Sequence, residues 1–77
     1  MAKVKGIKEV AKASRKIVQR NSNSWLAIYF DIDRNKVITE EEYDRMENTD
    51  GCFMLTHLIR PCTEAEVEQT VNRFRWM

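Results

Sequence analysis

The sequence predicts an α+β fold in which two helices cover a three-stranded antiparallel sheet. An amphipathic helical pattern at the N-terminus, two apolar runs of strand type in the middle and a helix-capping motif near the C-terminus support this prediction. The chain has 77 residues, of which 43% are hydrophobic and 32% charged. We expect residues 1–77 to form a single small domain with a thin core.

The first predicted element is a helix over residues 3–20. Its apolar residues recur at the i, i+3, i+4, i+7 spacing of one helical face, and most basic residues fall on or near the other side. The run NSNS at 21–24 ends the pattern, because short polar side chains compete for backbone hydrogen bonds. The positions on the apolar face are Val4, Ile7, Val10, Ala11, Ser14, Ile17 and Val18.

Two apolar runs predict the sheet, which we expect in meander order. WLAIYF is aromatic and branched, which favours a strand at 25–31 that is central or covered on both faces. DRNK is typical of a turn with Asn35 in the left-handed region, followed by a returning strand at 36–42. CFMLTHLI predicts a strand at 52–59. The polar stretch 40–51 fits a strand extension, a short helical turn or a loop.

A capping box opens the last predicted element, a helix over 64–76. Thr63 is placed to cap this helix, and Glu66 is placed to bond back to it. Trp76 lies roughly opposite the apolar stripe, where it is either a docking residue or a frayed end. The apolar stripe consists of Val67, Val71 and Phe74.

Cysteine use and the N-terminal pattern bear on the compartment. Cys52 and Cys62 are too few for a disulfide framework, so we interpret both as free thiols. With His57 they form C-x4-H-x4-C, which lacks the close pair of a zinc site. No secretory pattern opens the chain. We therefore expect a cytoplasmic protein.

Charge is divided between two segments. Residues 1–24 carry seven basic residues and one acidic residue, a net charge of +6. Residues 25–50 carry three basic residues and eight acidic residues, a net charge of −5. This asymmetry indicates a charged partner, or an attraction between the two segments inside the domain.

The stretch FDIDRNKVITEEEY at 30–43 allows two interpretations. The spacing of its oxygen-bearing residues resembles the calcium loop of EF-hand proteins, which implies a calcium site. However, Lys36 stands where that family has Gly, and residues 25–30 leave little room for an entering helix. A charged β-hairpin, which needs no cofactor, is therefore the other interpretation. The ligands that the resemblance implies are Asp31, Asp33, Asn35, Val37 through its carbonyl, and Glu42.

The chain is predicted to be a non-catalytic binding protein that engages a protein or nucleoprotein partner. His57 is the only histidine, and no phosphate-binding Gly motif or nucleophile pattern is present, so we do not expect an enzyme. In its size and its lack of catalytic residues the chain resembles compact phage-type inhibitors of host defence proteins, such as anti-CRISPR proteins. That resemblance implies an acidic segment that docks on a basic protein surface.

Two further interactions stay open. The basic helix is suited to contact phosphates, which makes a nucleic-acid-binding module the alternative function. A homodimer would bury the second apolar face of the sheet. The candidate partner-binding residues are Lys5, Lys8, Lys12, Arg15 and Lys16 in the basic helix, Glu40, Glu41 and Asp44 in the acidic segment, and Trp76.

Overall fold

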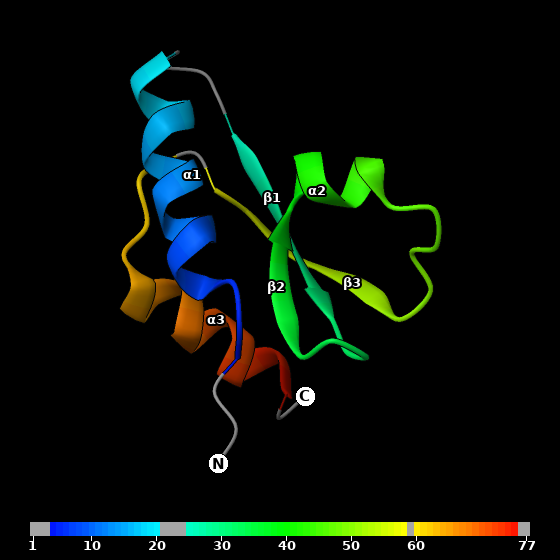
Figure 1. Cartoon of the computed structure of the whole chain (residues 1–77). Coiled ribbons are helices and arrows are strands. Elements are labelled where there is room, and N and C mark those ends of the chain that lie inside the picture. Colours follow the sequence, from blue (N-terminus) through cyan, green and yellow to red (C-terminus); the bar gives the residue numbers. More distant parts are fainter. Residues whose placement is uncertain (1–3, 21–24, 59, 76–77) are drawn as a thin grey trace.

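The computed structural model describes residues 4–20, 25–58 and 60–75 and confirms the α+β fold (Figure 1). Two long helices and a three-stranded antiparallel sheet are joined by one additional short helix. The elements are α1 (Ile7–Arg20), β1 (Leu26–Asp31), β2 (Lys36–Thr39), α2 (Glu40–Arg45), β3 (Cys52–Leu58) and α3 (Glu64–Arg75).

The strand order is β2-β1-β3, with β1 in the centre. The prediction that the first strand is central or covered on both faces is confirmed, and the prediction of meander order is wrong. β1 is buried at five of its six positions, because β2 and β3 flank its two edges and helices contact it on its faces. The segment 40–51 carries the chain from β2 across to the far side of β1, where β3 pairs with it.

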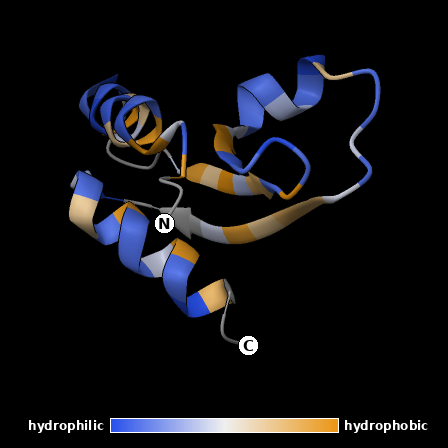
Figure 2. Cartoon of the chain, turned by 60° about the horizontal axis from the view of Figure 1, so that its bottom comes forward, coloured by the Kyte–Doolittle hydropathy of each residue, from blue (hydrophilic) through white to orange (hydrophobic). Residues whose placement is uncertain are grey.

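The helices α1 and α3 pack on one face of the sheet and enclose the main core. Figure 2 shows their apolar sides turned toward the strands. Each large aliphatic side chain in this layer contributes about 1.5–3 kcal/mol through burial. The buried core residues are Val10, Ala11, Leu26, Ile28, Phe30, Val37, Cys62, Val67 and Val71.

The first helix begins at Ile7, later than predicted, because the chain before it joins the sheet. Gly6 has a φ of +85°, which breaks the helical path. The Lys5 N–H donates to the Asn35 carbonyl at 3.0 Å, and the Lys5 carbonyl accepts from the Val37 N–H at 2.9 Å. Lys5 therefore covers the outer edge of β2. The prediction that Lys5 belongs to the basic helix is wrong.

The hairpin between β1 and β2 is confirmed. Its turn places Asn35 at a φ of 49°, in the left-handed region, and the Asn35 N–H donates to the Ile32 carbonyl at 3.2 Å. The returning strand ends at Thr39, so its predicted extension to residue 42 is wrong. The Thr39 hydroxyl caps α2 by accepting from the Glu42 N–H at 3.2 Å. Acidic residues in the first turn then favour a helix over a strand.

The second face of the sheet is covered in part by α2. The rings of Tyr29 in β1 and Tyr43 in α2 stack in parallel, with centroids 4.0 Å apart. Ala27 and Ile38 are 1% and 2% exposed although they alternate with residues of the main core. α2 therefore covers this part of the second face, and the homodimer stays a prediction.

The C-terminal helix is capped as predicted. The Thr63 N–H donates to Glu66 Oε1 at 3.3 Å, and the Glu66 N–H donates to Thr63 Oγ1 at 3.2 Å. Val67 and Val71 are buried and Phe74 is half-buried, which confirms the apolar stripe. The predicted ends at residues 59 and 76 lie outside the described residues, as does Trp76.

Candidate functional site

A hollow of about 290 Å³ is lined by residues of α1, of α2 and of the start of the central strand. It combines an apolar wall with an acidic wall, and we call it the acidic groove. Three of the predicted partner-binding residues line it, although the sequence did not place them beside the first helix. The lining residues are Ala13, Ile17, Trp25, Leu26, Thr39, Glu40, Glu41 and Asp44.

The apolar wall comes from α1 and from the residues that begin β1. Ala13 and Ile17 are one helical turn apart on α1, so they present one continuous strip to the groove. Trp25 precedes β1 and is 51% exposed, which leaves much of a large aromatic side chain accessible. Such a side chain offers both apolar contact and a π face that attracts cations.

The acidic wall is the first turn and a half of α2. Glu40 and Asp44 are spaced i, i+4 and therefore lie on the same side of this helix. Neither has an ion-pair partner among the described residues. Glu41 pairs with Arg45 at 2.6 Å between two largely exposed side chains. The groove thus keeps at least two carboxylates that no neighbouring cation of the described chain neutralises.

The tyrosine stack beneath α2 fixes the position of this acidic wall. Burial raises the pKa of Tyr29, and the nearby Glu40, Tyr43 and Asp44 raise that pKa further. Tyr29 therefore stays neutral and can stack on Tyr43 throughout the ordinary pH range. The six-residue helix α2 is too short to be stable alone, so its Thr39 cap and this stack hold it against the sheet.

The basic face of α1 is exposed and makes no ion pair within the described residues. Four ion pairs occur in this part of the chain, namely Arg34–Asp31, Lys36–Glu42, Arg45–Glu41 and Arg60–Glu66. None of them joins α1 to the acidic segment, so direct ion pairing does not account for the charge asymmetry. The exposed basic residues of α1 are Lys8, Lys12, Arg15, Lys16 and Arg20.

The residues that resemble a calcium loop form the β1–β2 hairpin and its continuation. The Asp31 carboxylate accepts from the Arg34 N–H at 3.3 Å and lies 3.6 Å from Arg34 Nε. Glu42 lies 3.5 Å from Lys36 Nζ. Within the described ranges, no three His, Cys, Asp or Glu side chains gather as metal ligands would. Calcium binding stays a prediction. Asp33 and Asn35 lie in the turn, and Val37 lies in β2.

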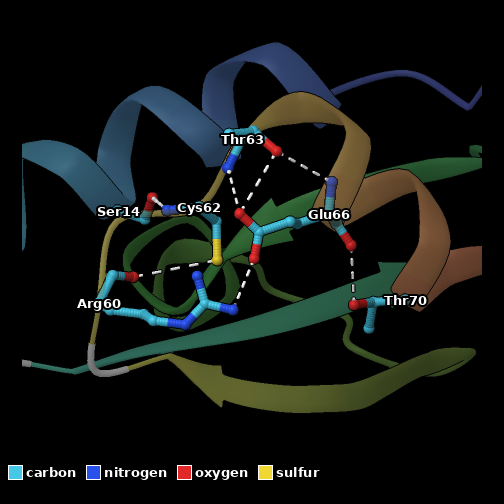
Figure 3. Close-up of polar contacts among 6 residues, drawn as sticks. All are labelled: Ser14, Arg60, Cys62, Thr63, Glu66 and Thr70. Atoms are coloured by element: carbon cyan, nitrogen blue, oxygen red, sulfur yellow. Dashed lines mark hydrogen bonds and ion pairs between the residues drawn. The ribbon is translucent and has the colours of Figure 1, made fainter.

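A polar network joins the start of α3 to α1 (Figure 3). The buried Ser14 Oγ accepts from the Cys62 N–H at 2.9 Å and donates to the Ala11 carbonyl at 2.8 Å. Ser14 was predicted on the apolar face of the first helix, without a hydrogen-bond partner. A serine within an apolar helical stripe was the available signal, because a buried hydroxyl needs a hydrogen-bond partner.

The ionic part of this network is used internally. Arg60 Nη2 lies 2.7 Å from Glu66 Oε2, and this hydrogen bond is the main reason why the pKa of Glu66 is lowered; the Thr63 backbone N–H lowers it too. Burial raises the pKa of the Cys62 thiol, which disfavours the reactive thiolate. Both cysteines of the chain are free thiols, as predicted. The network therefore has a structural role, in which it holds the start of α3 against α1.

Comparisons with protein-family models, with curated proteins and with solved structures found no match for this chain. Among the described helices, none combines the length and the apolar character that crossing a membrane requires.

Proposed function

We propose that the protein is a non-catalytic binding protein that receives a basic side chain of a protein partner in the acidic groove. The observation that carries this proposal is that Glu40 and Asp44 line the same groove as the exposed Trp25. Carboxylates and an aromatic ring in one groove fit an arginine or lysine side chain, which has a cationic end and an apolar stem.

Arginine suits the groove better than lysine. Its planar guanidinium can stack on an aromatic ring while it donates to a carboxylate, whereas the lysine ammonium is a compact point charge. Apolar residues of α1 offer contact for the rest of the partner segment. The mode of action is occlusion: the protein covers a basic surface that its partner needs, as the resemblance to compact phage-type inhibitors implies.

The test uses Trp25 as the reporter. In a Trp76→Phe background, Trp25 is the only tryptophan, so its fluorescence can be followed during titration with a short peptide of arginine and leucine. We expect a saturable change with this peptide. We expect no such change with the same peptide carrying citrulline, which keeps the shape of arginine but removes its charge.

A pair of double variants assigns this binding to the groove. Glu40→Gln with Asp44→Asn raises the net charge by two and should weaken binding at least tenfold. The control, Glu64→Gln with Glu68→Gln, also raises the net charge by two, but at exposed positions of α3. It should leave binding close to wild type. Equal weakening by the two double variants would refute the groove and leave only general charge attraction.

Nucleic-acid binding through α1 is a second candidate function, favoured by the absence of described ion pairs on its basic face. Lys8, Lys12, Arg15 and Lys16 lie at i, i+4, i+7 and i+8, so they form one cationic strip along the helix. Phosphate contacts by such a strip predict an affinity that falls steeply as salt rises.

The nucleic-acid test is a fluorescence-anisotropy titration of a labelled duplex at low and at physiological salt. We expect Lys8→Gln with Lys12→Gln to weaken binding and to reduce the salt dependence. Gln69→Glu with Asn72→Glu makes the same change in net charge on α3 and serves as the control. Absence of binding at low salt would eliminate this function.

A further inference from the structure

The two edges of the sheet are treated differently. At the β2 edge, Lys5 forms a parallel bridge with Lys36 and hydrogen bonds with Asn35 and Val37. At the β3 edge, no described segment pairs with the outer side of the strand. An uncovered strand presents unpaired N–H and C=O groups that can accept another strand.

β3 carries little that would keep another strand away. Natural edge strands are protected by charged residues, proline or bulges. The strand CFMLTHL contains no Asp, Glu, Lys, Arg or Pro. Its register shifts between Thr56 and Met54, which leaves Leu55 as a bulge and keeps the residues on both sides paired with β1. This bulge is the only protective feature among those three kinds.

Exposed apolar side chains lie on β3 and beside its start. Phe53 and Met54 in β3 are 45% and 53% exposed, on opposite faces of the strand. Ile32 is 52% exposed and adjoins the start of β3, because its N–H donates to the Gly51 carbonyl at 3.2 Å. Three of the four large apolar residues that are exposed in the described chain therefore lie at or beside this strand.

We propose that β3 is the interface of a homodimer in which two copies pair their β3 strands antiparallel about a two-fold axis. Such pairing places the residues of one strand opposite those of an identical strand, so a charged strand would oppose like charges. The neutral β3 avoids this repulsion. The resulting six-stranded sheet ends on both sides in a β2 edge that Lys5 covers, so the assembly closes at two copies.

The size of the interface predicts a weak dimer. Stable interfaces bury about 800 Å² on each partner, roughly one seventh of the 5832 Å² that one copy exposes. Pairing of a seven-residue strand, interrupted by one bulge, falls below that size. We therefore expect the dimer to form only at high protein concentration.

Sedimentation equilibrium over about 10 µM to 0.5 mM tests the dimer. The average mass should rise from 9.2 kDa toward twice that value with increasing concentration. Met54→Lys should remain at the monomer mass, because it adds a charge to each β3 strand at an exposed position. Gln19→Lys adds the same charge to the exposed face of α1 and should associate like the wild type.

Amide hydrogen exchange of the wild-type chain locates the interface without a substitution. We expect exchange in 52–58 to slow as the protein concentration rises, while exchange in α1 stays constant. A wild-type chain that is monomeric up to about 0.5 mM would overturn the proposal. A dimer that Met54→Lys does not weaken, with exchange in β3 independent of concentration, would also overturn it.

Discussion

Replacement of Gly6 by alanine should be one of the most damaging single-methyl changes in this chain. A Cβ at this position would lie 2.1 Å from the Val37 carbonyl oxygen, and the φ of +85° is unfavourable for any residue with a side chain. The left-handed backbone costs alanine about 1–2 kcal/mol. Relief of the clash requires the backbone at residues 5–6 to move away from β2.

That movement breaks the two hydrogen bonds by which Lys5 covers the sheet edge, which join it to Asn35 and Val37. Each is worth about 0.5–1.5 kcal/mol. Alanine also recovers about 0.4–1 kcal/mol by restricting the unfolded chain. We therefore expect Gly6→Ala to lower the free energy of unfolding by about 2–4 kcal/mol, a large part of the stability of a domain of this size.

Gly51→Ala is the matched control. Gly51 has nearly the same φ, +82°, but a Cβ there would meet only the Asp33 carboxylate, at 3.5 Å. This variant carries the conformational cost without the clash, and we expect a loss of about 1 kcal/mol. Urea unfolding of both variants measures the difference. Losses that agree within about 0.5 kcal/mol would refute the role of the Lys5 contact with β2.

Three further predictions concern other contacts. Ser14→Ala removes the buried acceptor of the Cys62 N–H and should cost about 1–3 kcal/mol in urea unfolding, whereas Gln19→Ala on the exposed face of α1 should cost little. The lowered pKa of Glu66 means that its contribution to stability is present above the ordinary value of 4.5 and is lost as pH falls through the lower folded value. The difference in thermal stability between wild type and Glu66→Gln should therefore shrink on acidification, and a constant difference would contradict this. Millimolar calcium should leave the melting temperature unchanged because Asp31 and Glu42 pair with Arg34 and Lys36, whereas a rise that Glu42→Gln abolishes would establish the calcium loop.

The features that local chemistry determines were predictable from the sequence. The left-handed Asn35, the Thr63–Glu66 capping box and the apolar stripes of the two long helices depend on residues within a few positions of each other. The cover on both faces of β1 was also predictable, because the strand has apolar residues on both faces.

The features that distant contacts determine were missed. The late start of α1 depends on the close approach of Gly6 to the Val37 carbonyl. The order of the strands depends on which edge of β1 pairs with β3. The partners in these contacts are far apart in the sequence, so no local pattern encodes them. The sequence predicted only the acidic residues of the groove, Glu40, Glu41 and Asp44, as candidates for binding a partner. It did not predict Trp25 and Ile17, because these residues line the groove only through the packing of α1 beside α2.

The strand order also has a consequence for the order of folding. β1 and β2 are joined by a four-residue turn, so their pairing closes a short loop and costs little chain entropy. Pairing of β3 with β1 closes a much longer loop, and α3 docks later still through the Ser14–Cys62 contact. We expect β3 and α3 to form last and to open first in native-state fluctuations. The face of β3 that α3 covers, where Phe53 contacts Phe74, would then spend the longest time exposed during synthesis, so rapid docking of α3 limits aggregation through this face.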